Sequence, residues 1–224
     1  MTKHARLSCR TLAFAFFLGS SSLVTAQPVT TLFNTGVDSG GGPLPQGSPD
    51  PHYSLISVPN GSGYPSTPFV AAGNIYPFIH SPGWVPQSST SQWIIPVSGT
   101  TENLMSGNYV YRTTFDLTGR DPGTATLTLH VAVDDALTDI LLNGASTGIN
   151  RVGFSAFSSA FTITTGFHNG INTLDFLVTN ATGAIINPTG LRVEVTSVPE
   201  PSAVLYCGVG VAGAAIRRWG RRHQ

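Results

Sequence analysis

The chain has 224 residues, contains 25 glycines and 16 prolines, and carries 11 basic and 11 acidic side chains, so its formal net charge is zero. Between residues 27 and 197 there are four arginines, no lysine and ten acidic residues, a net charge of −6. This balance excludes a nucleic-acid footprint and a polybasic patch for anionic lipid. Both cysteines, Cys9 and Cys207, lie outside residues 27–197, which excludes disulfides, cysteine nucleophiles and thiolate metal sites there.

The first 26 residues have the three parts of a secretory signal peptide. A basic region comes first, residues 12–18 are apolar, and residues 24–26 offer a small-residue cleavage site before Gln27. The basic residues are Lys3, Arg6 and Arg10. We therefore expect export through the Sec translocon and removal of residues 1–26 by signal peptidase. The alternative, an uncleaved N-terminal anchor, would also place the rest of the chain outside the cytoplasm.

The first part of the exported region has only weak strand signals. Residues 27–66 are rich in turn formers, with short strands predicted over residues 29–33 and 52–58. Residues 66–86 are irregular but contain four aromatic side chains, which in such stretches usually anchor long loops to a sheet. These are Phe69, Tyr76, Phe78 and Trp84. A further strand is predicted over residues 92–97.

From residue 109 onward, apolar and polar residues alternate in the way that predicts β-strands. Strands are predicted over residues 109–117, 124–133, 136–142, 157–164, 173–178 and 190–195. Asp134 and Asp135 break the pattern between the second and third, and Asn143-Gly144 is a strong hairpin signal. No stretch of residues 27–197 has a convincing helical period. The sequence therefore predicts one all-β domain, an antiparallel β-sandwich or jelly roll of roughly eight to ten strands.

Four stretches of this region form a recognisable set. They are residues 109–115, residues 127–133, the run from Asp134 to Gly144, and a turn of glycine, aliphatic residue and asparagine within residues 170–174. Together they resemble galactose-binding-domain-like jelly rolls over about half of the exported region. The resemblance implies a β-sandwich that serves sugar binding, adhesion and accessory roles beside hydrolases. It indicates a fold and does not fix an activity.

Asp134, Asp135 and Asp139 form the densest acidic cluster, and three interpretations of it are open. Their oxygens could bind Ca²⁺. Two of them could act as the carboxylate pair of a glycosidase. Asp134 and Asp135 could instead be turn residues that bond to their own backbone. The motifs of serine hydrolases, zinc proteases and phosphate-binding loops are missing from the sequence, and we expect no cofactor other than Ca²⁺.

Aromatic side chains are the second candidate site. Pyranose rings stack on tryptophan and tyrosine while polar side chains bond the hydroxyls, and Trp84, Tyr76 and Arg151 are the candidate sugar contacts. The alternative is that these aromatic residues pack in the core or anchor loops. Trp93 lies in a predicted strand and is expected in the core. Trp84 lies among prolines and glycine and is expected to be exposed.

The end of the chain, residues 198–224, combines three features in order. Pro199-Glu200-Pro201 interrupts any strand or helix, because proline fixes φ and lacks a donor. Residues 203–216 are apolar and uncharged, and arginines follow. The arginines are Arg217, Arg218, Arg221 and Arg222. An apolar helix of 14 residues spans roughly 21 Å against a hydrocarbon core of about 30 Å, and arginines with Trp219 at the interface could recover part of the difference. We therefore predict a C-terminal transmembrane helix with a cytoplasmic basic end.

This tail resembles the PEP-CTERM sorting signal of Gram-negative bacteria. The resemblance implies that the protein is exported, is held in the inner membrane by its tail, and is recognised by an exosortase, a membrane-bound cysteine protease-transpeptidase. The alternative is a hydrophobic C-terminal helix with no sorting role. The predicted organisation is a signal peptide (1–26), a β-sandwich ectodomain (27–197) and a sorting and anchor segment (198–224).

Three functions are compatible with these features. The first is a non-enzymatic envelope or extracellular-matrix protein that is structural or associates with extracellular polysaccharide. The second is a polysaccharide hydrolase, or the accessory domain of one, that uses Asp134, Asp135 and Asp139. The third is a spacer or adhesin that binds no sugar. A glycan panel distinguishes them, because only a hydrolase releases reducing sugar and only the third gives no binding.

Overall fold

The structure is a computed structural model that describes residues 31–197 apart from residues 75, 80–81, 100–101 and 183–185. The predicted signal peptide and the predicted sorting tail lie outside the described residues. All described residues belong to one compact unit, Ala26–Pro201. No helix in this described part of the chain has the length and apolar character needed to cross a membrane.

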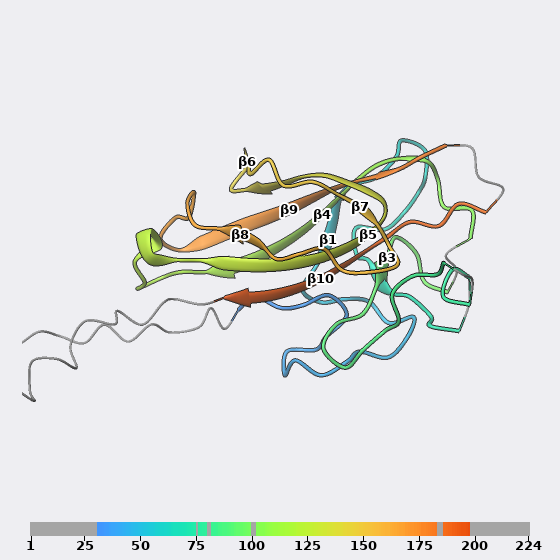
Figure 1. Ribbon diagram of the computed structural model, residues 1–224, viewed down its shortest axis with the longest axis horizontal. Coiled ribbons are helices and arrows are strands. Elements are labelled where there is room, and N and C mark those ends of the chain that lie inside the picture. Colours follow the sequence, from blue (N-terminus) through green and yellow to red (C-terminus); the bar gives the residue numbers. More distant parts are fainter. Residues whose placement is uncertain (1–30, 75, 80–81, 100–101, 183–185, 198–224) are drawn as a thin grey trace, which may run out of the picture. The chain divides into compact units, whose positions relative to one another are not determined.

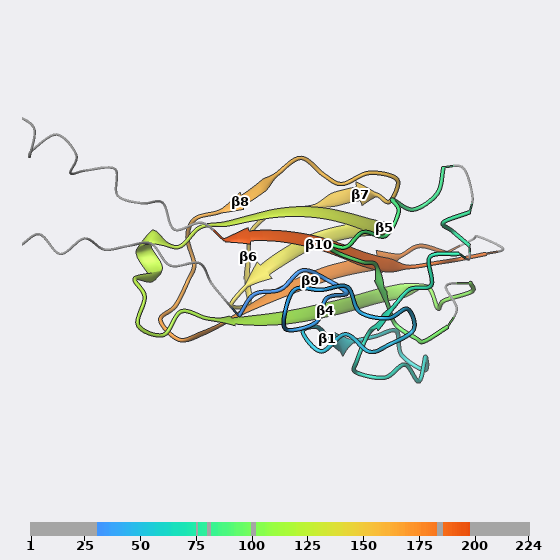
Figure 2. The ribbon, with the colours of Figure 1, turned by 90° about the horizontal axis from the view of Figure 1, so that it is seen from below.

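Ten strands and one short 3₁₀ helix make up the described fold, which confirms the all-β antiparallel prediction (Figures 1 and 2). The strands are β1 (Ser54–Ser57), β2 (Phe69–Val70), β3 (Ile94–Ile95), β4 (Gly107–Asp116), β5 (Leu127–Leu142), β6 (Ala145–Ser146), β7 (Arg151–Gly153), β8 (Phe161–Ile163), β9 (Ile171–Asn180) and β10 (Gly190–Ser197), and the helix is η1 (Pro122–Thr124). They form one curled sheet in the order β1-β4-β9-β5-β10-β3-β2, and β6, β7 and β8 pair with β5.

Strand β5 organises the sheet because it changes partners halfway along its 16 residues. Residues 127–134 pair with β10, whereas residues 136–142 pair with β9. The change falls at Asp134 and Asp135, which are joined by a cis peptide bond. The prediction of a turn between two separate strands was therefore wrong, since both aspartates belong to β5. The position at which the pattern breaks is nevertheless the position at which the strand passes from one neighbour to the other.

The sheet curls strongly at this point and brings the two ends of β5 toward one segment. Leu127, at the start of β5, pairs with Ile163 in β8. Asn143, directly after the end of β5, donates from its Nδ2 to the carbonyl oxygen of Gly166 at 2.9 Å. Residues 163 and 166 are only three positions apart, so both ends of β5 lie close to the same short segment. The sheet therefore bends back on itself and encloses apolar side chains.

Both halves of β5 contribute to the same hydrophobic core. The first half supplies every second residue from Leu127 to Val133, and β4 and β9 supply alternating aromatic and aliphatic residues. The largest fully buried core side chains of β4 and β9 are Tyr109, Tyr111, Phe115 and Phe176. This period of two is the pattern that the sequence shows from residue 109 onward, because successive side chains of a strand point to opposite faces.

Three of the shortest strands are not predicted from the sequence. Strands β2, β6 and β7 have two or three residues, too few for an alternating pattern to appear. The strand predicted over residues 92–97 is limited to Ile94–Ile95, and the described residues 31–33 of the first predicted strand are not in a strand.

The two ends of the sheet carry different parts of the chain. Thr31 accepts a hydrogen bond at its Oγ1 from the N–H of Asp116 at the end of β4, and Ser197 pairs with Leu127 at the start of β5. The described chain therefore starts and finishes at this end. At the other end, Gly190 at the start of β10 pairs with Asp134. We call this second end the distal end, and loops lie around it in Figures 1 and 2.

Candidate functional site

A pocket of about 410 Å³ lies among the loops of the distal end. Its apolar lining residues are Phe78, Trp84 and Pro86. Its polar lining residues are Gln46, Asn74 and Gln87. Among the described residues, no charged side chain lines it. Aromatic surface with a few side-chain amides is typical of a small-molecule site that binds an uncharged polar ligand.

Trp84 forms a wall of this pocket but is only 2 % exposed, so the prediction of an exposed tryptophan was wrong. Its Nε1 donates to Oδ2 of Asp134 at 2.6 Å, and its ring stacks on Trp93 with centroids 4.1 Å apart. A β-carbon at Gly190 would lie 2.7 Å from the Trp84 ring, so the indole packs directly on the backbone of β10. The buried carboxyl group and the stacking fix the indole, which the sequence around Trp84 does not indicate. Trp93 is fully buried, as predicted.

The amide side chains of the pocket fall into two kinds. Gln87 is already bonded within the domain, because its Nε2 donates to the carbonyl oxygen of Ala71 at 2.9 Å and its Oε1 accepts from the N–H of Trp93 at 2.7 Å. Gln46 and Asn74 are exposed and make no hydrogen bond to the described residues. An amide carries donors and acceptors together, so these two side chains are available to a ligand of either character.

Gly73 keeps the pocket open. A β-carbon at this position would lie 3.3 Å from Nε2 of Gln46 and 3.4 Å from Cγ of Gln87. Both neighbours are lining residues of the pocket, and Gly73 itself completes the lining. A larger side chain at residue 73 would therefore displace the amides or fill the space between them.

Hydrogen bonds from a buried arginine, Arg192 of β10, hold residues 85–91, the loop next to the pocket. Its Nε donates to Oγ of Ser91 at 2.7 Å and its Nη2 donates to Oγ of Ser88 at 2.8 Å. Its Nη1 donates to the carbonyl oxygens of Val85 and Pro86. Burial lowers the pKa of Arg192, and the neighbouring Glu194, with an oxygen 3.7 Å from Nη2, opposes that effect. The guanidinium group thus connects the sheet to residues 85–91.

Asp134 is buried behind the pocket wall and does not belong to the described lining. Burial raises the pKa of its carboxyl group to about 7, the hydrogen bond from Trp84 acts in the opposite direction, and the charge of Asp135 adds to the increase. Oδ2 of Asp135 accepts from the N–H of Ala181 at 2.7 Å. Asp134 therefore acts here as the acceptor that positions Trp84.

The third aspartate of the predicted cluster has partners of its own. Oδ1 of Asp139 accepts from the N–H of Ile140 at 2.8 Å, and Oδ2 accepts from Oγ of Ser146 at 2.5 Å. In the part of the chain that the structure describes, no group of three or more histidine, cysteine or acidic side chains is arranged to hold a metal ion. The structure therefore does not bring Asp134, Asp135 and Asp139 together as one group of ligands.

The other two candidate sugar contacts lie outside the described lining. Tyr76 is half-buried in the loop that carries Asn74 and Phe78. Arg151 lies in β7, where its Nη2 donates to the carbonyl oxygen of Ala156 at 3.3 Å. Trp84 is thus the one predicted contact that lines the pocket. Sequence reasoning missed the amides, and it identified Phe78 only as one of the aromatic residues in an irregular stretch.

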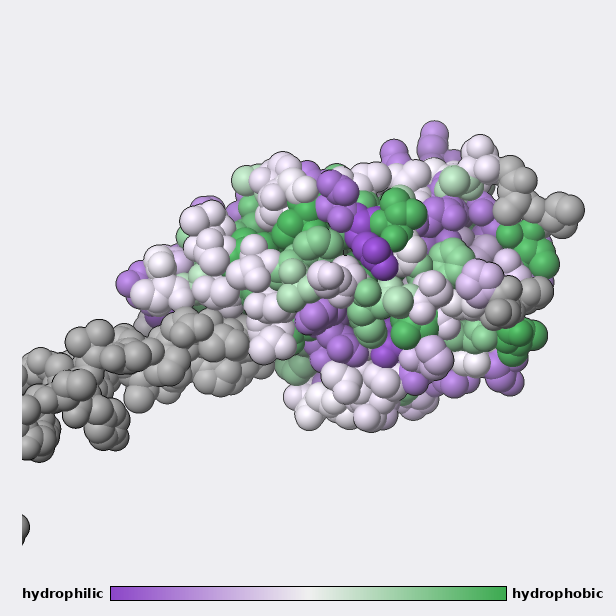
Figure 3. Space-filling model, in the orientation of Figure 1, coloured by the Kyte–Doolittle hydropathy of each residue, from purple (hydrophilic) through white to green (hydrophobic). Residues whose placement is uncertain are grey.

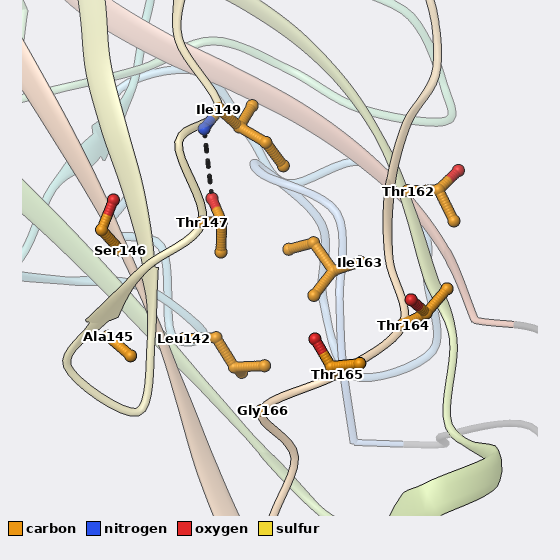
Figure 4. A pocket seen from close by; sticks show the side chains of 10 residues that line it. All are labelled: Leu142, Ala145, Ser146, Thr147, Ile149, Thr162, Ile163, Thr164, Thr165 and Gly166. Atoms are coloured by element: carbon orange, nitrogen blue, oxygen red, sulfur yellow. Dashed lines mark hydrogen bonds between the residues drawn. The ribbon is translucent and has the colours of Figure 1, made fainter.

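A second pocket, of about 320 Å³, lies at the opposite end from Asp134. In Figure 4, the side chains of Leu142, Ile149 and Ile163 point into the gap between two segments, and the N–H of Ile149 donates to Oγ1 of Thr147 at 3.3 Å. Hydroxyl side chains surround these apolar residues. The described lining contains neither an aromatic nor a charged side chain, so it offers less to bind a specific ligand than the distal pocket does.

Exposed hydrophobic side chains are dispersed over the described surface. Large ones occur singly in β1, in the loop after Phe78, before β4, in β7 and in β9; they are Ile56, Ile79, Met105, Val152 and Ile171. Figure 3 shows the hydrophobic residues of one face in small groups separated by polar ones. This distribution favours the distal pocket over a broad apolar surface as the binding site.

The sorting residues Pro199, Glu200 and Pro201, together with the arginines that follow, lie outside the described residues. Comparison of the chain with protein-family models, with curated proteins and with solved structures found no match. The features of this protein that bear on its function are therefore the geometry of the distal pocket and the sequence of the two chain ends.

Proposed function

We propose that this protein is an exported, exosortase-sorted, non-catalytic module of the cell envelope or extracellular matrix that binds carbohydrate at its distal pocket. The observation that carries the proposal is the pocket itself, which is lined by partly exposed Phe78, by Trp84 and by the exposed amides of Gln46 and Asn74. The C–H face of a sugar ring packs on an aromatic ring, while amides bond its hydroxyl groups.

The position of the pocket supports the same proposal. Ser197 lies at one end of β10 and Gly190, beneath Trp84, lies at the other. They are the first and last of the eight residues of this extended strand, so about 23 Å separates them. If residues 198–224 form the predicted inner-membrane anchor, the pocket lies on the side of the domain away from the point of attachment, where polysaccharide is accessible.

We interpret the curled sheet as a β-sandwich of the jelly-roll type, like that of galactose-binding modules. The two halves of β5 pair with different neighbours, as expected for a strand shared by two layers.

A glycan array with the purified protein tests the function. Wild-type protein should retain a subset of glycans, and Phe78→Ala should weaken that binding about tenfold, which corresponds to about 1.4 kcal/mol of lost stacking. Ile79→Ala is the matched control, because Ile79 is adjacent in sequence, 71 % exposed and not in the lining. An array without any signal would favour a spacer or adhesin instead.

The hydrolase alternative is tested in the same experiment. Release of reducing sugar from a bound glycan, abolished by Asp134→Asn, would show that the protein is an enzyme. Burial of Asp134 behind Trp84 favours binding without cleavage, since a general acid must reach the glycosidic oxygen.

A further inference from the structure

The distal pocket has a charge character that restricts which sugars it can hold. Its polar lining consists of amides, and among the described residues it contains neither a cation nor an anion. An amide bonds a hydroxyl group equally well as donor or acceptor. A carboxylate, phosphate or sulfate group on a ligand would lose its hydration in such a pocket without gaining a charged partner.

The arginine nearest to the pocket wall is not available to such a group. The side chain of Arg192 is 2 % exposed, and its three nitrogens donate to two serine hydroxyl groups and two backbone carbonyl oxygens. One of these carbonyls belongs to Pro86, a lining residue, so the guanidinium group lies behind the wall. Its face is covered by Phe157 at 4.8 Å, and Glu194 provides its counter-charge.

Carboxyl groups lie on the other side of the wall, and because the pKa of Asp134 is raised to about 7, the formal charge of the whole domain contributes more than Asp134 does. Asp134 bonds the indole of Trp84 from behind, Asp135 follows it, and residues 27–197 carry a net charge of −6. An anionic sugar would therefore approach a negatively charged domain. Inside the pocket, only the Trp84 side chain would separate it from the carboxyl group of Asp134. Electrostatics of this sign lower both the association rate and the affinity for anions.

The size of the pocket limits the ligand further. A volume of about 410 Å³ is close to the lower end of the range for small-molecule sites, about 300–1,000 Å³. Such a space suits one sugar unit and not a long stretch of polymer. The volume depends on the glycine at residue 73, because a β-carbon there would already lie 3.3 Å from Nε2 of Gln46 and 3.4 Å from Cγ of Gln87.

We infer that the distal pocket selects a single neutral sugar unit and rejects uronic, phosphorylated and sulfated sugars. The inference rests on the proposed function and adds the substrate class to it. Gln46 and Asn74 bond the hydroxyl groups, Phe78 packs against the ring, and the acidic surroundings exclude anions.

Calorimetric titration of the full-length protein in detergent with matched sugar pairs tests the inference. Each pair consists of a methyl hexoside and the corresponding uronic acid, which differ only at carbon 6. The neutral member should bind at least about tenfold more tightly. Gln46→Lys, at an exposed lining position, should reduce that ratio at least about tenfold by providing a cation. Thr164→Lys, an exposed position in the pocket at the other end, makes the same charge change and should leave the ratio unchanged.

The outcomes separate the inference from the proposed function. Equal or tighter binding of the uronic acid would overturn the selectivity and leave carbohydrate binding intact. An unchanged ratio in Gln46→Lys would also overturn it, because discrimination would then not arise in this pocket. If neither member of any pair binds, and Gly73→Leu, which fills the pocket, alters nothing on a glycan array, then carbohydrate binding and selectivity both fail.

Discussion

The carboxyl group of Asp134 links the stability of the domain to pH. Burial raises its pKa from 3.8 to about 7, so between these values the folded protein retains a proton that the unfolded chain releases. Its contribution to the free energy of unfolding is complete below about pH 4 and is lost as the pH rises through about 7. We expect the urea midpoint to fall from pH 5 to pH 8. The fall should be smaller in Asp134→Asn, which keeps an acceptor for Trp84 without the charge.

Two comparisons make this prediction specific. Asp139→Asn should retain the pH dependence of the wild type, because Asp139 is outside the wall of the pocket and has its own partners. Burial also raises the pKa of Asp50, against the hydrogen bonds from the N–H groups of Gly36 and His52, so Asp50 acts in the same direction. Asp134→Asn should consequently reduce the dependence and not abolish it. An identical slope in the variant and the wild type would contradict the assignment.

Arg192 is the residue that joins the pocket loop to the sheet. Lysine cannot reproduce its planar fork of donors, so Arg192→Lys leaves some buried acceptors among Ser88, Ser91 and the carbonyls of Val85 and Pro86 without partners. We expect a loss of about 2–4 kcal/mol in the free energy of unfolding, measured by urea denaturation. Hydrogen exchange of residues 85–91 should become faster, since their anchor is weakened.

The same substitution, arginine to lysine, at residue 112 is the control. Arg112 forms a bidentate pair with Asp175, but its side chain is 37 % exposed, so water can replace lost contacts. Arg112→Lys should cost less than about 1 kcal/mol and leave residues 85–91 unaffected. Equal losses in the two variants would show that burial of Arg192 is not what makes it important.

At the scale of elements, the hairpin after β5 is fixed by one side chain. Nδ2 of Asn143 donates to Gly166 and to Oδ1 of Asn172, and Oδ1 of Asn143 accepts from the N–H of Thr173. The turn is thereby bonded both to β9 and to the segment after β8. Asn143→Ala should lower the free energy of unfolding by about 1–3 kcal/mol in urea titrations. It also removes a residue suited to the positive φ of 52° at this position.

Asn60→Ala provides the comparison for that turn. Asn60 also precedes a glycine, but it is exposed and makes no hydrogen bond to the described residues. Its replacement should change stability by less than about 0.5 kcal/mol. A similar cost at both positions would mean that the Asn-Gly turn, and not the network around Asn143, sets the effect.

The sequence predicts the long elements of this fold well and the partners of β5 poorly. Residues 109–117, 173–178 and 190–195 alternate over enough positions to identify β4, β9 and β10. The break at Asp134 and Asp135 is visible, yet local sequence does not say whether a strand ends or passes to another neighbour. That outcome depends on β9 and β10, which follow about 40 residues or more along the chain.

The candidate site shows the same limit more clearly. Trp84 was identified from its type, but its burial depends on Asp134, 50 residues away. The amides of Gln46 and Asn74 line one pocket only because two loops fold over the same end of the sheet. A contact that joins distant segments leaves no periodic signal in either one, so sequence reasoning identified the aromatic component and missed the polar one.

For the whole molecule, the sequence of the C-terminal tail and the position of the pocket support the same arrangement. Strand β10 ends at Ser197, the last described residue, while the candidate binding pocket lies near the start of the same strand. A protein sorted by its C-terminal tail needs a domain that remains functional when that end is fixed. The sorting proposal therefore predicts an effect on processing that is separate from any effect on the pocket.

We predict that replacing Pro199-Glu200-Pro201 by three alanines leaves the precursor unprocessed in the inner membrane. The substitution removes the predicted sorting motif and leaves the apolar sequence of residues 203–216 unchanged. Cell fractionation followed by immunoblotting distinguishes the full-length and the shortened forms. The wild type should appear shortened and outside the inner membrane, and the variant should accumulate at full length in that membrane.

Substitution within the domain separates sorting from binding. Phe78→Ala should be processed like the wild type, because Phe78 lines the pocket at the distal end and the tail begins beyond Ser197. Replacing Arg217, Arg218, Arg221 and Arg222 by glutamine should reduce retention of the precursor, since the basic flank holds the predicted helix at the cytoplasmic surface. If the alanine-substituted motif matures and is released as the wild type is, the sorting proposal is wrong, and carbohydrate binding at the distal pocket then stands or falls by the glycan measurements alone.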